Sequence, residues 1–289
     1  MRTVIVVAVA MLFCASSFAK TSKGVWWWNA EDGANSVRAA KSLQFLSSRG
    51  VDEIYYCADL TRYVKETREF VKAAGKRGMR VALLSGDVSW IYPGNRGFAE
   101  TLKTYLSYQK DAAPNERFYA LHLDVEPHQD RKLSDERKWQ LYADFVLRAA
   151  ADVHAAGENI EWDIPFWLDN IFVEYGERKG VSLLEVVMGC SDCVALMSYR
   201  DTAEAMLDVS KTEIALAAKG RTRVVLGAET GETGEGSIVT FFEEGSKVMD
   251  RELAKVEKAL ESAKVPAGAG IAIHHLGSWE KLLEKEDKK

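Results

Sequence analysis

The chain has 289 residues, a net charge of −5 and a 47% share of hydrophobic residues. This length suits one large α/β domain, because barrels of that class commonly need roughly 250 residues. The acidic balance argues against a nucleic-acid partner, since a phosphate-binding surface usually carries an excess of Lys and Arg.

The first 19 residues have the pattern of a secretory signal peptide. Arg2 supplies the positive start, residues 4–13 form an apolar run too short to span a bilayer, and small residues precede a cleavage site near Ala19. No later segment is long and apolar enough to cross a membrane. We therefore expect a secreted or periplasmic protein with one mature domain over residues 20–289 and no membrane span.

Three cysteines follow the signal segment, at Cys57, Cys190 and Cys193. An odd and small number does not describe a scaffold built on disulfides. Cys190 and Cys193 have the spacing of a metal or redox pair, but no second Cys or His pair lies near them, and Cys193 opens an apolar run. Burial is the favoured interpretation, and whether these two cysteines pair is left open.

Short β-like runs alternate with helical segments along the whole mature chain. The expected strands are 24–29, 51–58, 80–84, 118–126, 159–164, 193–199, 223–229 and 268–275. The expected helices are 36–48, 61–74, 98–109, 134–156, 183–188, 202–219, 238–264 and 279–289.

Eight strand–helix units predict an α/β fold, a (β/α)8 TIM barrel, with an open doubly wound sheet as the alternative. No Gly-x-Gly-x-x-Gly follows the first strand, so a dinucleotide site loses its usual support and no cofactor is expected. The Gly-rich segment 227–237 carries three acids and no Lys, which favours a mobile loop over a phosphate cradle.

The fourth expected strand carries the strongest functional signal. His122, Asp124 and Glu126 alternate with apolar residues, so the three ionisable groups share one face of the strand. Pro127 and polar residues follow, which places these groups at the carboxyl end of the strand. Barrel enzymes build their sites at this end.

Acids and aromatic residues also gather at the other expected strand ends, as a carbohydrate site requires. Aromatic rings stack on sugar faces, and carboxylates transfer protons and bind hydroxyl groups. The candidate substrate-binding residues are His122, Tyr199, Asp163, Trp28, Trp90, Trp167 and His274.

Glycosidic cleavage needs an acid to protonate the departing oxygen and a second group to stabilise the developing positive charge. Glu126 is the candidate acid, because burial and the neighbouring Asp124 would hold its proton. Two residues compete for the second role. Glu229 could be a nucleophile, or Asp124 could orient a substrate acetamido group that itself attacks.

The segment His122-Leu-Asp124-Val-Glu126 resembles the end of the Asp-x-x-Asp-x-Asp-x-Glu motif on strand four of chitinase-type glycosidases (family 18). Met197-Ser-Tyr199-Arg-Asp201 resembles their strand-six Met-x-Tyr-Asp/Asn. The resemblance implies that Glu126 is the acid, that Asp124 assists the acetamido group and that Tyr199 contacts it. Tyr119 and His122 stand where that motif has its first two Asp residues.

Val125-Glu126-Pro127 is also similar to the strand-four Asn-Glu-Pro of the large retaining barrel clan of cellulases and β-galactosidases. That resemblance implies a nucleophilic Glu at the end of strand seven, where Glu229 stands. Both resemblances give Glu126 the same role, and they differ over Asp124 and Glu229.

Two other functions remain open. One is a metal-dependent hydrolase that uses His122, Asp124 and Glu126, with His274 or His275 completing a zinc or manganese site. The other is a non-catalytic glycan-binding barrel. His122 could instead be a core histidine and Glu229 a solvated loop residue. The leading hypothesis is an exported glycoside hydrolase without a metal, whose sugar, linkage, stereochemistry and oligomeric state the sequence does not define.

Overall fold

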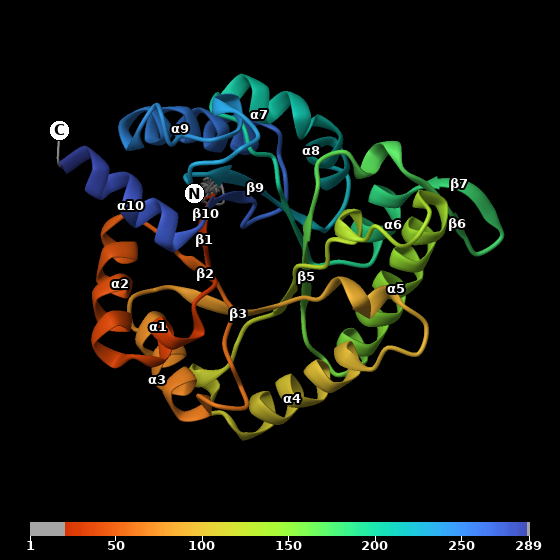
Figure 1. Cartoon of the computed structure of the whole chain (residues 1–289), viewed down its shortest axis with the longest axis horizontal. Helices are drawn as coiled ribbons and strands as arrows, with labels where there is room; N and C mark the ends of the chain where they lie inside the picture. Colours follow the sequence, from red (N-terminus) through yellow and green to blue (C-terminus); the bar gives the residue numbers. More distant parts are fainter. Residues whose placement is uncertain (1–20, 288–289) are drawn as a thin grey trace, which may run out of the picture.

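The computed structural model describes residues 21–287, and the expected signal segment 1–19 lies outside them. Eight parallel strands close into a barrel in the order β1, β2, β3, β4, β5, β8, β9, β10 and back to β1 (Figure 1). The strands are β1 Ser22–Trp27, β2 Glu53–Tyr56, β3 Arg80–Ser85, β4 Leu121–Leu123, β5 Ile160–Ile164, β8 Cys193–Leu196, β9 Arg223–Glu229 and β10 Gly270–His274. The predicted (β/α)8 barrel is confirmed, and pairing of β1 with β10 rules out the open sheet.

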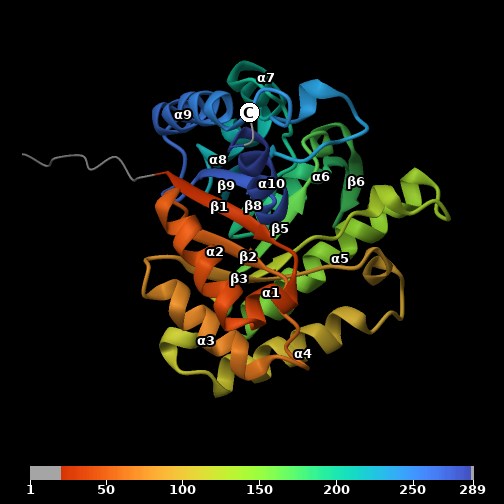
Figure 2. The same ribbon diagram turned by 60° about the vertical axis from the view of Figure 1, so that its left-hand side comes forward.

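Helices surround the barrel, and most follow the predicted segments. They are α2 Ser36–Ser48, α3 Val64–Gly75, α4 Gly97–Asp111, α5 Asp135–Ala155, α6 Leu183–Gly189, α7 Ala203–Val209, α8 Lys211–Ala217, α9 Ser246–Ser262 and α10 Leu276–Asp287. In Figure 2 the strands run from left to right, so their carboxyl ends and the loops after β3 and β4 lie on the right.

Several boundaries differ from the sequence prediction. The expected helix 202–219 breaks at Ser210 into α7 and α8, and α9 begins only at Ser246. The fourth strand is much shorter than 118–126, because Asp124 to Glu126 already turn toward a 3-10 helix over Pro127–Gln129. Sequence analysis also missed the short helix α1 (Ala30–Ala34) and a hairpin of β6 (Phe172–Tyr175) and β7 (Arg178–Ser182).

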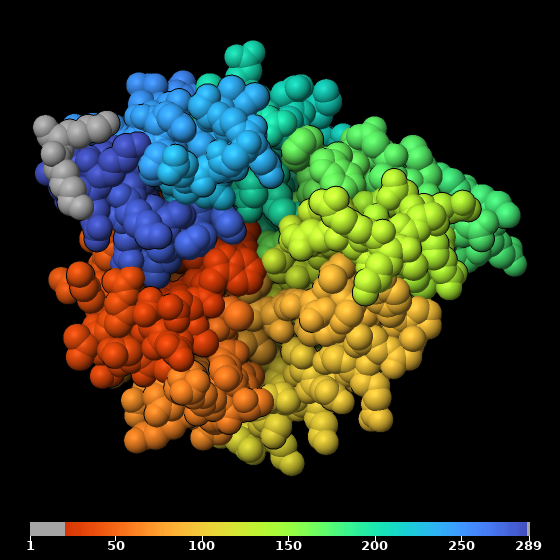
Figure 3. All heavy atoms as spheres, in the orientation of Figure 1, coloured from red at the N-terminus to blue at the C-terminus, as the bar shows by residue number. Residues whose placement is uncertain are grey.

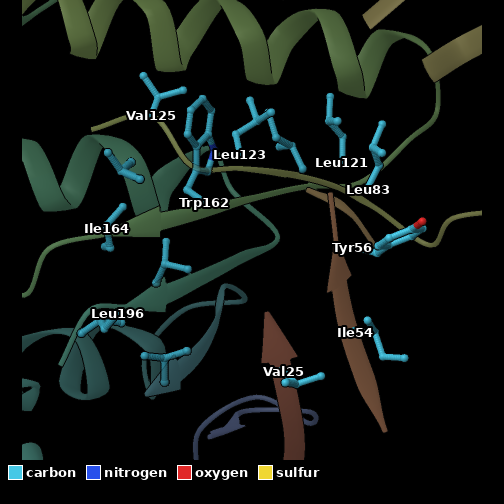
Figure 4. Packing of buried hydrophobic residues seen from close by; sticks show 14 of the residues in the cluster. Val25, Ile54, Tyr56, Leu83, Leu121, Leu123, Val125, Trp162, Ile164 and Leu196 are labelled. Atoms are coloured by element: carbon cyan, nitrogen blue, oxygen red, sulfur yellow. The ribbon is translucent and has the colours of Figure 1, made fainter. Parts of the chain in front are cut away.

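Two apolar clusters form the core on opposite sides of the strands. The larger lies between the strands and the helices, where Leu121, Leu123 and Trp162 point toward α5 (Figure 4). Tyr142 and Phe145 of α5 meet the Trp162 ring edge-on. The smaller cluster fills the barrel with Trp26, Tyr55, Ala82, Leu84, Ala120, Cys193, Ala195, Val225 and Ala272. Because side chains alternate along a strand, every second side chain points into the barrel, and polar side chains at these positions point inward as well.

Candidate active site at the carboxyl ends of the strands

The segment after β4 keeps the alternation that the sequence predicts. Val125 continues the outward apolar row in Figure 4, whereas His122 lies inside the barrel with its ring centroid 4.1 Å from that of Tyr55. Asp124 and Glu126 follow above His122 and are both partly exposed. Figure 3 views this face, where the loops after β3, β4 and β9 (gold, yellow-green and light blue) stand around a recessed middle.

His122 is fully buried between two carboxylates and does not reach the mouth. Its Nδ1 lies 3.1 Å from Oε2 of Glu161, and its Nε2 lies 2.9 Å from Oδ1 of Asp163. Burial alone would lower the pKa of His122, but Asp163 and Glu161 outweigh it and raise the pKa to about 10. The expectation that His122 contacts substrate is therefore corrected: it is a charged core histidine that holds acids in place.

Asp163 of β5 links the interior to the mouth. Its Oδ2 accepts a hydrogen bond of 3.0 Å from the indole Nε1 of Trp26, and its Oδ1 faces His122. The side chain of Asp163 is buried, so it supports the acids after β4 and is not open to a substrate. Sequence analysis placed Asp163 at the strand end correctly but assigned it to substrate binding.

A layer of ionic residues fills the barrel below His122. Arg223 bridges Glu53 at 2.8 Å and Glu161 at 2.7 Å, and Arg80 also pairs with Glu53. Burial would raise the pKa of Glu161, but His122 and Arg223 hold it down at about 2. Sequence analysis missed these residues, although Glu53, Glu161 and Arg223 each interrupt or open an apolar run at an inward position.

The pKa values of both acids at the mouth are raised. Burial, together with the negative charges of Asp163 and Glu126, raises the pKa of Asp124 to about 8. Burial also raises the pKa of Glu126; the charge of Asp163 adds to this, and His128, Gln129 and His274 oppose it. A carboxyl group with a raised pKa keeps its proton to higher pH, where it can donate that proton to a substrate.

Tyr199 lies among the acids. Burial raises its pKa well above the usual value, and the negative charges of Asp163, Glu229, Asp124 and Glu126 raise it further. The four carboxyl groups come from three strand ends, and all lie close enough to act electrostatically on the Tyr199 phenol. Gly227 makes room for the ring, because a Cβ there would lie 3.0 Å from Tyr199 and 2.6 Å from the carbonyl oxygen of Leu196.

Glu229 and His274 are neighbours on paired strands at the mouth. The Nδ1 atom of His274 lies 2.6 Å from Oε2 of Glu229, and Oε1 of Glu229 accepts hydrogen bonds from the backbone N–H groups of Thr230 and Gly231. Burial would raise the pKa of Glu229, but His274 and these N–H groups lower it. Glu229 is thus an ionised carboxylate fixed by hydrogen bonds, and not a freely solvated loop residue.

The three tryptophans predicted to bind substrate occupy different environments. Trp28 is 37% exposed, and its ring lies 6.4 Å from that of His274. Trp167 is partly exposed and meets the ring of His128, which itself lies beside Glu126. Trp90 is only 7% exposed and packs on Phe98 and Phe145 between the barrel and its helices. It therefore does not belong to the group of side chains at the mouth.

The metal hypothesis loses its first ligand, because both ring nitrogens of His122 face carboxylates. Over residues 21–287, no three His, Cys, Asp or Glu side chains are grouped to hold a metal ion.

The cysteines Cys57, Cys190 and Cys193 do not form disulfides, so Cys190 and Cys193 are not paired with each other. Among the helices that the structure describes, none could cross a membrane.

Solved structures of sugar-acting barrels share this fold. A chitinase from Chromobacterium violaceum has 11% sequence identity and a TM-score of 0.51 over 93% of this chain and 99% of its own. A fungal β-1,4-galactanase has 13% identity and a TM-score of 0.55 over 89% of both chains. D-psicose 3-epimerase from Clostridium cellulolyticum has 13% identity and a TM-score of 0.53 over 91% of this chain and 90% of its own.

The chain is therefore a TIM barrel with distant structural similarity to chitinases and other barrel enzymes acting on sugars. The resemblance to chitinase-type glycosidases is confirmed at the level of the fold. No protein family and no curated protein matches the sequence. Identity this low shows the fold alone, and the activity has to be argued from the site.

Proposed function

We propose that this protein is a glycoside hydrolase in which Glu126 is the general acid. The observation that carries the proposal is the pair of carboxyl groups Asp124 and Glu126, both with raised pKa values, at the carboxyl end of β4. A carboxyl group whose pKa is raised keeps its proton to higher pH and can protonate a departing glycosidic oxygen. A purely glycan-binding barrel has no use for such a group.

The surrounding residues fit the rest of the reaction. As the glycosidic bond breaks, positive charge develops at the anomeric carbon, and the ionised carboxylate of Glu229, one of the acids that act on Tyr199, supplies negative charge at this site. Trp28 and Trp167 offer partly exposed rings at the rim for sugar faces. The substrate is a polysaccharide or glycoconjugate, and Asp124 and Tyr199 contact it beside the scissile bond.

We further propose that the protein is exported, with the signal peptide of residues 1–19 removed near Ala19. Mass spectrometry of the protein recovered from the growth medium or periplasm tests this. A mature chain that begins at about Lys20 supports export, and an intact Met1 in the cell interior contradicts it.

The activity is tested by incubating the purified mature chain with a panel of polysaccharides, glycoconjugates and 4-nitrophenyl glycosides, and measuring new reducing ends or nitrophenol. Hydrolysis that is lost in Glu126→Gln supports the proposal. Glu235→Gln, an exposed acid in the loop after β9, is the matched control and keeps full activity. Glycan binding without turnover by the wild type, or equal turnover in Glu126→Gln, contradicts the proposal.

A further inference from the structure

Both oxygens of the Glu229 carboxylate take part in hydrogen bonds within the protein. Its Oε1 accepts from the N–H of Thr230 at 2.7 Å and of Gly231 at 2.6 Å. Its Oε2 lies 2.6 Å from Nδ1 of His274. Each oxygen therefore already accepts at least one hydrogen bond, which makes it a weaker nucleophile toward the anomeric carbon. This arrangement favours a supporting role for Glu229 over the sequence hypothesis that Glu229 attacks the sugar.

The same hydrogen bonds fix the state of His274. A carboxylate that accepts two backbone N–H groups is ionised, so it also accepts from His274, and Nδ1 carries the hydrogen in this contact. In the neutral ring the Nε2 lone pair is then available. Among residues 21–287, no hydrogen-bond partner lies at Nε2 of His274.

The ring of His274 lies in the aromatic part of the mouth. Its centroid is 5.7 Å from that of Trp26, 6.4 Å from that of Trp28 and 5.4 Å from that of Tyr199. His274 also interacts electrostatically with Glu126, so the two groups lie within electrostatic range of each other. The partly exposed His274 thus lies at the same end of the barrel as Glu126, at the carboxyl ends of the strands.

We infer that His274 is the general base of the hydrolysis and that Glu229 is its positioning residue. The inference rests on the proposed function and deepens it. A water molecule forms the new bond to the anomeric carbon while its proton passes to Nε2 of His274. The glycosidic C–O bond breaks with its electron pair on the leaving oxygen, which takes the proton of Glu126. The products are a free hemiacetal and the alcohol, and the proton on His274 returns to Glu126 through solvent.

This assignment predicts inversion at the anomeric carbon, because water attacks once from the face opposite the leaving group. It also predicts that no sugar becomes attached to the protein. A nucleophilic Glu229 or an attacking acetamido group would instead give two displacements and retention.

Proton NMR of the first product formed from the most rapidly hydrolysed 4-nitrophenyl glycoside of the panel tests the inference. His154 is an exposed residue in the last turn of α5 that pairs with Asp192, and it provides the control. Inversion, with His274→Gln slowed about 10²–10⁴-fold and His154→Gln unchanged, supports the inference. Retention, or covalent labelling of Glu229 by a 2-fluoro sugar, overturns it while leaving the glycosidase proposal intact. If no glycan or glycoside is hydrolysed, the proposed function fails first.

A measurement without substrate tests the role of Glu229. Two-bond ¹H–¹⁵N correlation spectra of histidine-labelled protein report which ring nitrogen of His274 carries the hydrogen. We expect Nδ1–H with an unprotonated Nε2 in the neutral wild-type ring, and a mixture or the opposite tautomer in Glu229→Gln, with kcat lowered and KM little changed. Nε2–H as the main neutral tautomer of the wild type overturns the inference.

Discussion

The Nε2 atom of His122 lies 2.9 Å from Oδ1 of Asp163, and this contact joins two layers of the barrel interior. Below it lies the ionic layer of Glu53, Glu161 and Arg223. Above it lie the acids at the mouth, and the charge of Asp163 raises the pKa of both Asp124 and Glu126. The buried histidine thus supports a group whose charge adds to the effect of burial in raising the pKa of the candidate acid.

Replacing His122 should destabilise the fold strongly. His122→Gln leaves Glu161 and Asp163 without their shared positive partner inside the barrel. Breaking a buried ion pair by removing one partner costs about 3–5 kcal/mol of the free energy of unfolding. Urea unfolding followed by circular dichroism measures this, and a loss below about 1 kcal/mol would show that the contact contributes little.

The same residue makes stability depend on pH. Burial lowers the pKa of His122, but Asp163 and Glu161 raise it to about 10, compared with about 6.5 in an unfolded chain. The contribution of His122 to the free energy of unfolding is complete below pH 6.5 and is lost as pH rises toward 10. We expect the difference in unfolding free energy between wild type and His122→Gln to shrink across that window. A difference that stays constant from pH 6 to 10 would contradict the assignment.

Gly227 leaves the space that Tyr199 occupies, so its replacement should affect both stability and activity. In Gly227→Ala the new Cβ would lie 2.6 Å from the backbone oxygen of Leu196, a contact that forces a shift costing roughly 1–3 kcal/mol. Gly234→Ala is the control, because nothing lies within 4 Å of its added Cβ. Thermal unfolding and turnover of both variants check this, and equal behaviour would show that the site tolerates movement of Tyr199.

His128 should tune the pH range of the reaction. Its Nε2 lies 3.6 Å from Oε1 of Glu126, and its positive charge partly offsets the effect of burial on the pKa of that acid. His128→Gln should therefore raise the pKa of Glu126. Because the acid must be protonated to work, the alkaline fall in kcat/KM moves to higher pH, by up to about one unit. A pH–rate profile unchanged or shifted downward would argue against this contact.

Trp28 and Trp90 offer a paired test of the rim. Trp28→Ala should leave stability nearly unchanged and raise KM about fivefold, if its exposed ring contributes about 1 kcal/mol by stacking on a sugar. Trp90→Ala should instead lower the free energy of unfolding by about 3–5 kcal/mol, since its ring is packed in the core. A loss of stability in Trp28→Ala together with a raised KM in Trp90→Ala would contradict these assignments.

Much of the fold could be predicted from the sequence, because strand alternation and helix ends are local signals. The positions of Asp124 and Glu126 followed from the same alternation. The exact bounds did not, since Asp124 to Glu126 leave the barrel ladder although their pattern continues that of a strand. The hairpin of β6 and β7 was missed even though Gly176 lies between two β-like runs, a recognisable turn signal.

The roles of the polar side chains were harder to predict than their positions. His122 at a strand end suits either a ligand contact or a core partner, and only the approach of Glu161 and Asp163 from β5 decides between them. The contact of His274 with Glu229 depends equally on the pairing of β9 with β10. Such partners lie tens of residues away in the chain, so no local pattern reveals them.

The central claim is that Glu126 donates a proton to the leaving oxygen, and the dependence of turnover on the leaving group tests it most directly. For aryl glycosides of the sugar identified by the panel, Glu126→Gln should lower kcat about 10²–10⁴-fold when the leaving phenol is a weak acid. With 2,4-dinitrophenyl glycosides, whose departing oxygen needs no proton, the same variant should keep most of its activity. An equal loss on both kinds of substrate, or no loss on either, would contradict the account.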